Sequence, residues 1–128
     1  MCGISGFWEM RAGGDAGARL AAGQAMTAAL ARRGPDDEGS WQDPDVPLFL
    51  GQRRLAVIDL SSDGHQPMIS ASGRYIVNYN GEIYNYTELS AELAALGIKF
   101  RGRSDTEVML AAFERLVRLV LEALRFER

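Results

Sequence analysis

Residues 48–58, Leu-Phe-Leu-Gly-Gln-Arg-Arg-Leu-Ala-Val-Ile, contain two short apolar runs on either side of a polar Gly-Gln-Arg-Arg segment. The runs at 48–50 and 55–58 have the length and the β-branched content expected of buried strands. Further strands are predicted at 3–8 and at 75–79, and residues 61–67 are rich in turn-forming side chains. The central part of the chain therefore predicts a buried sheet.

Helical patterns lie on both sides of these strands. An Ala-rich run from Arg19 to Arg32 has high helix propensity, and Gly34-Pro35 is expected to end it. A second helix is predicted from Thr87 to Ala95, with Asn85 or Thr87 as N-cap and Gly97 as the stop.

A third helix is predicted to open at the capping-box pattern Ser-Asp-Thr-Glu, residues 104–107, and to carry an apolar stripe. Residues 11–18 are expected to form a loop, and Ile83-Tyr84 to begin a return strand after the Asn80-Gly81 turn. Strands followed by helices and then by further strands predict an α+β layered domain.

The composition is that of an ordinary globular chain. Its 128 residues are 47% hydrophobic and 24% charged, which is enough for one compact domain over 1–128. A net charge of -3 gives no reason to expect nucleic acid or a membrane surface as a partner. No apolar run approaches the roughly 20 residues of a membrane span, and no secretory signal is recognisable. A cytoplasmic location is therefore the expectation.

The chain has one cysteine, Cys2, and one histidine, His65. A single cysteine excludes an internal disulfide, and this pair is too small for a His/Cys metal cluster. Cys2 is either an inert buried thiol, as most free cysteines are, or a nucleophile. Removal of Met1 would place a free α-amino group on Cys2, so that one residue supplies both thiol and base. His65 lies among turn residues and is expected to be solvated.

Three further groups suit chemistry as well as structure. Asn80-Gly81 with Glu82 is adequately explained as a turn, yet an amide and a backbone N–H directed at one point suit an oxyanion. Arg54 is either a solvated residue beside an apolar strand or a residue whose guanidinium binds a carboxylate through two hydrogen bonds. Asp105 favours a helix N-terminus electrostatically, and together with Glu82 it also suits a substrate ammonium group. Thiol, arginine and two carboxylates together would fit glutamine.

Six stretches resemble, in order, the class II glutamine amidotransferase domain of glutamine-hydrolysing asparagine synthetases. They are Met-Cys-Gly-Ile-Ser-Gly at 1–6, Arg-Arg-Gly-Pro-Asp-Asp-Glu-Gly at 32–39, Arg-Arg-Leu-Ala-Val-Ile-Asp-Leu at 53–60, Gly-His-Gln-Pro-Met at 64–68, Asn-Gly-Glu-Ile-Tyr-Asn-Tyr at 80–86 and Ser-Asp-Thr-Glu-Val at 104–108. The resemblance covers about residues 1–112 and is specific because the motifs keep their order.

The resemblance implies a four-layer αββα sandwich of the amino-terminal nucleophile hydrolase type. It also implies a role for each matching residue: Cys2 as nucleophile with its α-amino group as base, Asn80 and Gly81 as the oxyanion hole, Arg54 on the glutamine α-carboxylate, Glu82 and Asp105 on its α-amino group, and backbone groups of Leu55, Ala56, Val57 and Ile58 in the pocket. The implied glutaminase half-reaction needs no cofactor or metal. In the family the ammonia passes to a synthetase domain that uses ATP and Mg²⁺ to amidate aspartate.

Two departures from the family pattern stand out. Gln52 occupies a position where relatives usually carry histidine, a change expected to be tolerated. After about Phe113 the expected strands are replaced by an apolar helical tail, and no synthetase domain follows, so the sandwich is expected to be incomplete and weakly active or inactive alone. A companion chain supplying the synthetase domain is one expectation. A non-catalytic module that binds glutamine or a protein partner through the apolar helix is the alternative.

Overall fold

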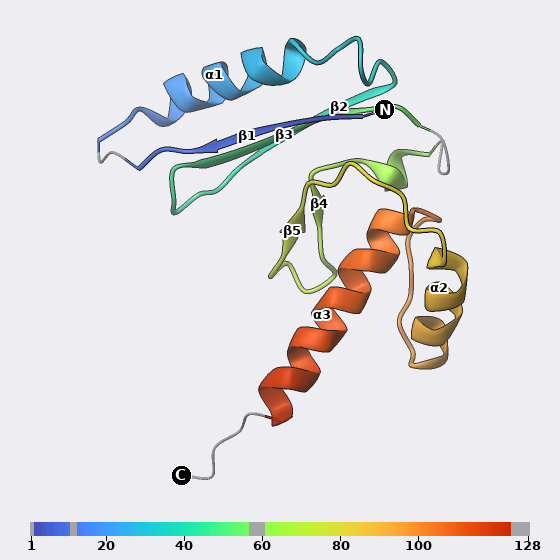
Figure 1. Ribbon diagram of the computed structural model, residues 1–128. Coiled ribbons are helices and arrows are strands. Elements are labelled where there is room, and N and C mark those ends of the chain that lie inside the picture. The colour runs from blue at the N-terminus through green and yellow to red at the C-terminus, as the bar shows by residue number, and fades with distance from the viewer. Residues whose placement is uncertain (1, 11–12, 57–60, 124–128) are drawn as a thin grey trace, which may run out of the picture.

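The computed structural model describes residues 2–10, 13–56 and 61–123 and shows an α+β fold with two small sheets and three helices (Figure 1). The elements in chain order are β1 Gly3–Trp8, α1 Ala16–Ala28, β2 Asp37–Gln42, β3 Leu48–Arg54, the short 3-10 turn η1 Ser62–Gly64, β4 Met68–Ile69, β5 Ile76–Val77, α2 Tyr86–Ala95 and α3 Asp105–Ala123. The α+β prediction is confirmed at this level.

The larger sheet has the antiparallel order β1-β3-β2, so the apolar strand β3 lies in the middle. Phe49 of β3 pairs with Phe7 of β1, and Gly51 pairs with Ser40 of β2. The β2–β3 turn is closed by Asp43, whose carboxylate accepts hydrogen bonds from the backbone N–H groups of Asp45 (2.8 Å) and Val46 (2.9 Å). This side-chain turn fixes the register of the two strands.

Helix α1 covers one face of this sheet and packs against all three strands. Asp15 caps its N-terminus by accepting from the N–H groups of Gly17 and Ala18, so the helix starts earlier than predicted and residues 16–18 are not a loop. It ends at Ala28 rather than near Arg32, because tighter i→i−3 bonds replace the helical ones over the next turn.

The two faces of β3 have different neighbours because side chains alternate along a strand. Phe49 is fully buried toward α1, where it stacks on Phe7 with a centroid distance of 5.8 Å. Burial of such a ring contributes about 1.5–3 kcal/mol to the free energy of unfolding. Gln52 and Arg54, only 1% and 9% exposed, lie on the opposite face. On that face Gln52 donates to the Tyr79 carbonyl and Arg54 donates to the Ser61 carbonyl.

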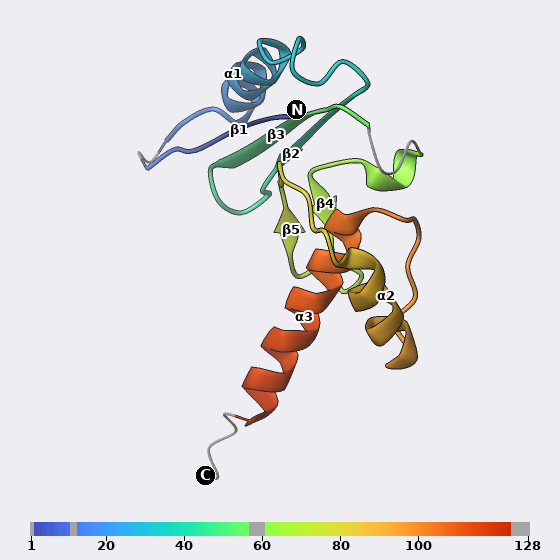
Figure 2. The same cartoon turned by 45° about the vertical axis from the view of Figure 1, so that its right-hand side comes forward.

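The hairpin β4–β5 and helices α2 and α3 lie on the side of the sheet away from α1 (Figures 1 and 2). Met68 pairs with Val77 in the hairpin. Buried Met68, Leu93, Val108 and Leu110 form the apolar centre of this half, and α2 packs against α3. The molecule therefore has one core under α1 and a second one beside α3.

Several strand predictions are wrong, and for related reasons. Leu55 and Ala56 are not in a strand: their N–H groups are bound by the Cys2 thiol and the Asp36 carboxylate instead of a neighbouring strand. Residues 57 and 58 lie outside the described residues. Ile83-Tyr84 is not a strand, since the Ile83 N–H donates to the Asp105 carboxylate. The strand predicted at 75–79 is confined to 76–77, and β2 was not predicted because its sequence is polar.

The helix ends confirm part of the predicted caps. Gly97 follows α2 with φ of +87°, a conformation that glycine adopts without strain. Asn85 precedes α2 but makes no side-chain capping bond. Before α3, Ser104 Oγ accepts from the Thr106 N–H at 3.2 Å, an N-cap bond to the second helical residue. The predicted capping box does not form, because the Glu107 carboxylate accepts from the N–H groups of Arg101 and Gly102.

Gly23 is the point where α1 approaches β3 most closely, since an added Cβ would overlap the Phe49 ring. Gly23→Ala should therefore lower the free energy of unfolding by about 1–3 kcal/mol through overpacking, despite the better helix propensity of alanine. Gly17→Ala is the matched control, because Gly17 lies in the same helix with only an ordinary contact to Asp15. It should stabilise the protein slightly, by up to about 1 kcal/mol. Urea denaturation of the two variants measures both effects, and equal stability would contradict this packing.

Candidate active site

Cys2 lies at the N-terminal end of β1, half-buried, next to the residue that follows β3. Its Sγ accepts a hydrogen bond from the Leu55 N–H at 3.3 Å and donates to the Leu55 carbonyl at 3.7 Å. Alternation along β1 directs Gly3 toward α1, where an added Cβ would touch Leu30, and so directs Cys2 to the opposite face. The thiol therefore shares the sheet face of Arg54.

The segment Asn78-Tyr79-Asn80 crosses this same face. Asn80 donates from its amide nitrogen to the Cys2 carbonyl oxygen at 3.0 Å, across 78 residues of sequence. Gly81 follows directly, and a side chain there would overlap the Tyr79 hydroxyl. The structure thus brings the predicted oxyanion residues to the predicted nucleophile.

Carboxamide side chains hold this segment in place. Gln66 Oε1 accepts from the Tyr79 N–H at 2.7 Å, and Gln52 Nε2 of β3 donates to the Tyr79 carbonyl at 3.3 Å. Asn78 Nδ2 donates to the Gly51 carbonyl at 2.8 Å and to the Ser5 carbonyl at 3.4 Å. The chain that leads into Asn80 is therefore held at known points.

Arg54 is the last residue of β3 and is buried, in contrast to the solvated reading of its sequence position. The chain leaves the sheet after Arg54, whereas the sequence predicts that a strand follows this residue at 55–58. Its guanidinium donates to the Ser61 carbonyl at 3.0 Å and lies so close to Gly64 that any side chain at 64 would overlap it. The glycine makes room for the arginine head.

The two predicted acids have different surroundings. Asp105, 7% exposed at the start of α3, accepts from the Ile83 N–H at 3.0 Å. Glu82, which directly precedes Ile83 in the sequence, is exposed. The structure therefore joins Asp105 to the loop that carries Asn80, Gly81 and Glu82, and Asp105 contributes at least a structural contact there.

The predicted backbone pocket at 55–58 is described in part. Leu55 contacts Cys2, and the Ala56 N–H donates to Asp36 Oδ2 at 2.9 Å. Val57 and Ile58 lie outside the described residues. His65 is exposed, as expected of a loop residue, and its Nδ1 lies 2.8 Å from Asp37 Oδ2.

The sequence reasoning missed the residues that hold the site together. Gln66, Gln52 and Asn78 make the contacts that place residues 78–80, yet none of them was singled out as a site residue. One signal was available: carboxamides occur at both 66 and 78, inside or beside recognisable motifs, and buried amides require partners.

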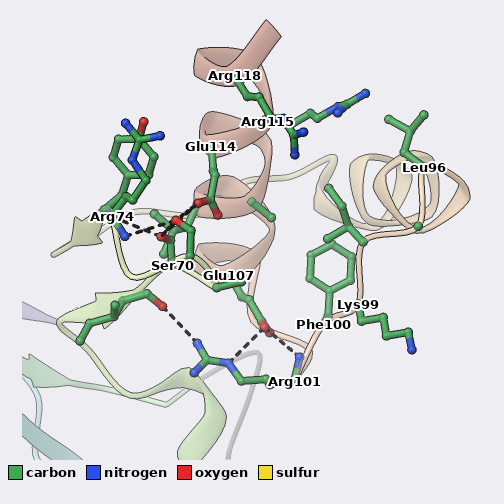
Figure 3. A pocket seen from close by; sticks show the side chains of 18 residues that line it. Ser70, Arg74, Leu96, Lys99, Phe100, Arg101, Glu107, Glu114, Arg115 and Arg118 are labelled. Carbon is green, nitrogen blue, oxygen red and sulfur yellow. Dashed lines mark hydrogen bonds and ion pairs between the residues drawn. The ribbon is translucent and has the colours of Figure 1, made fainter. Parts of the chain in front are cut away.

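A cavity of about 1050 Å³ lies elsewhere, between the β4–β5 hairpin, residues 96–101 and α3 (Figure 3). None of the predicted site residues lines it. Among the described residues, no three His, Cys, Asp or Glu side chains gather as a metal site would need. Nor is any described helix both long and apolar enough to cross a bilayer.

Comparison with known proteins identifies a family for the chain. The family described as "Glutamine amidotransferase domain" matches residues 1–125. "Asparagine synthetase [glutamine-hydrolyzing] 3" of Bacillus subtilis is 38% identical over 88% of this chain, and "Asparagine synthetase [glutamine-hydrolyzing] 1" of the same organism is 44% identical over 69%. "Amidase chry2" of Gibberella zeae is 36% identical over 89% of this chain.

The matched stretch is a small part of each relative: 18%, 13% and 18% of their lengths, respectively. The family match, in contrast, extends over nearly the whole of this chain and includes Cys2, Arg54, Asn80 and Asp105. The chain therefore belongs to the glutamine amidotransferase domain family and resembles the glutaminase part of asparagine synthetases.

Proposed function

We propose that this chain is a glutaminase that releases ammonia from L-glutamine through a thioester on Cys2. The observation that carries the proposal is the hydrogen bond from Asn80 to the Cys2 carbonyl, which joins the donor loop to the residue that bears the thiol across 78 residues of sequence. The names of the relatives, glutamine-hydrolysing asparagine synthetases, support the same substrate.

The reaction follows from the groups gathered at this face. With Met1 removed, the Cys2 α-amino group takes the thiol proton and Sγ attacks the glutamine side-chain carbonyl carbon. The tetrahedral intermediate expels ammonia as the amine returns the proton. Water then hydrolyses the γ-glutamyl thioester to glutamate and the free thiol, with the same amine as base.

Asn80 and Gly81 are proposed to stabilise the oxyanion. An amide nitrogen carries two hydrogens, so Asn80 can hold the Cys2 carbonyl with one and direct the other at the intermediate. The Gly81 N–H supplies a second donor where no side chain intervenes. Loss of one such donor typically costs about 10²–10³ in kcat.

Arg54, Glu82 and Asp105 are proposed to recognise the amino-acid end of glutamine. A guanidinium suits the α-carboxylate because it can form two parallel hydrogen bonds. The two carboxylates suit the α-ammonium group, Glu82 from an exposed loop and Asp105 from the start of α3. Backbone groups at 55–58 would complete the pocket.

The complete fold and the fate of the ammonia are proposals as well. The arrangement of α1, a three-stranded sheet, a hairpin and two helices is compatible with the αββα sandwich of amino-terminal nucleophile hydrolases. We propose that residues 1–128 act as one glutaminase domain in the cytoplasm. Its ammonia would pass to a synthetase domain or companion chain, where ATP and Mg²⁺ support amidation of aspartate.

Replacement of the nucleophile is the direct test. Cys2→Ala should lower glutamate release from glutamine by more than about 10³-fold, because the covalent step is lost. Glutamate is measured with purified protein whose intact mass shows that Met1 has been removed from both forms. Equal rates in the two proteins would refute the nucleophile assignment.

Arg54→Lys tests the carboxylate contact. The variant keeps the charge but loses the planar fork, so KM for glutamine should rise by about 10- to 100-fold, the equivalent of about 1.5–3 kcal/mol, with a smaller change in kcat. Arg53→Lys is the matched control, since the neighbouring Arg53 instead contacts Glu38 and the Gly34 carbonyl. A similar rise in KM in both variants would count against a specific role for Arg54.

A second candidate function, a partner-dependent binding module, is supported by apolar side chains that are exposed along α3, outside the cavity. Figure 3 shows Leu96 and Phe100 on one side of that helix and Arg74 on the other. Further along α3, Leu116 is 60% exposed and Phe113 51% exposed. Such a run of exposed apolar side chains is typical of a surface that another polypeptide covers.

Leu116→Glu separates the two candidates. The site lies at the opposite end of the molecule from the outer turns of α3, so a glutaminase should keep its kcat and KM in this variant (Figure 2). A module that folds only against a partner on this face should instead show weak helical circular dichroism and no glutamate release in both the unsubstituted chain and the variant. Activity, circular dichroism and glutamine titration of the variant decide between them, and Cys2→Ala serves as the inactive reference.

A further inference from the structure

The Asn80–Glu82 loop is an exposed bridge between two buried points of attachment. Residues 80–82 are all exposed, whereas the backbone is bound at Tyr79 on one side and at Ile83 on the other. Within the loop, the Asn80 side chain donates to the Cys2 carbonyl, which ties the loop to the nucleophile but fixes the backbone at neither end. Exposed backbone without fixed partners is mobile, so the location of the donor loop depends also on its two backbone attachments.

Gln66 makes the first attachment. Its side chain is buried, at 6% exposure, with Oε1 accepting from the Tyr79 N–H at 2.7 Å and Nε2 donating to Thr106 Oγ1 at 3.2 Å. A backbone N–H can only donate, so Oε1 must face Tyr79 and the amide has one orientation. Gln66 therefore links the Tyr79 peptide directly to the first turn of α3.

Asp105 makes the second attachment from the same turn of α3, through the Ile83 N–H. Residues 104–108 are all buried, so this turn is among the most enclosed parts of the helix. Thr106 Oγ1 also lies 3.5 Å from Asp105 Oδ1. Both ends of the loop thus depend on one rigid element, with Gln66 as the link on the side of Asn80.

We propose that Gln66 is a positioning residue for the glutaminase reaction: it sets the distance of Asn80 and Gly81 from Cys2 without touching the substrate. The inference rests on the proposed function for its chemical consequence. Gln52 supports the next peptide group from the sheet, since its Nε2 donates to the Tyr79 carbonyl. Loss of the Gln66 contact would leave Tyr79 held at its carbonyl alone.

The test compares Gln66→Met with Gln66→Glu in the full chain. Methionine has a similar length but accepts no hydrogen bond of comparable strength. Glutamate keeps an oxygen for the Tyr79 N–H, and the Thr106 hydroxyl can turn to donate to its other oxygen. We expect Gln66→Met to lower kcat by about 10- to 100-fold, as small misplacements of catalytic groups do, with KM nearly unchanged. Gln66→Glu should recover most of kcat.

Amide hydrogen exchange provides a readout that does not depend on activity. Gln66→Met should accelerate exchange of the Tyr79 N–H by about 10- to 100-fold, while the N–H groups of β3 stay protected. Thr27→Val is the control for a general loss of stability. Thr27 is fully buried and hydrogen-bonded to Ser5 and to the Gly23 carbonyl under α1, away from the loop. It should change neither kcat nor exchange at Tyr79.

The outcomes separate this inference from the proposed function. Unchanged exchange at Tyr79 in Gln66→Met would show that Gln66 does not hold the segment, whatever the activity. Faster exchange with unchanged kcat would show a structural contact without a positioning role. If the unsubstituted chain releases no glutamate, the proposed function fails and the catalytic part of this inference fails with it, while exchange still decides the attachment.

Discussion

The hydrogen bonding of the Tyr79 backbone is the constraint on which the rest of the structure depends. This backbone lies where a polar segment crosses the buried face of the larger sheet, and each of its groups must find a partner there. Gln66 and Gln52 supply those partners from two different parts of the chain. A two-stranded hairpin such as β4–β5 is only marginally stable by itself. Attachment to the three-stranded sheet through these carboxamides compensates for its size.

Because side chains alternate along β3, the residues of the apolar core and those of the candidate site lie on opposite faces of this strand. Phe49 and Gly51 face α1, so the apolar core of this half requires nothing from the other face. Gln52 and Arg54 face the crossing segment and are buried by polar neighbours instead. The Arg54 guanidinium and the Gln52 amide nitrogen have hydrogen bonds that replace water, whereas Gln52 Oε1 is buried without a hydrogen-bond partner among the described residues. The same strand therefore supports a conventional core and a polar site, with one residue between successive members of each.

Much of the site could be predicted from the sequence, whereas several strands could not. Motif order brought Cys2 and Asn80 into one hypothesis, and the structure places them in contact. The strand predicted at 55–58 is wrong where it is described, because the thiol of Cys2 and the carboxylate of Asp36 take its backbone donors. Competition of this kind depends on residues distant in sequence, so no local pattern shows it. The attachment through Gln66 is equally non-local, since its two partners lie 13 and 40 residues away.

The family motifs at 32–39 and 64–68 contain no candidate catalytic residue, and non-local contacts of the same kind explain them. Gly39 lies against the Gln66 carbonyl so closely that a Cβ would overlap it, and Gly64 leaves the same kind of space for the Arg54 guanidinium. Asp36 binds the backbone beside Leu55. The stretches at 32–39 and 64–68 thus pack against candidate site residues and the residues that hold them. A side chain at Gly39 or Gly64 would displace Gln66 or the Arg54 guanidinium without removing any reactive group, so the positions of Gln66 and Arg54 depend on these two glycines.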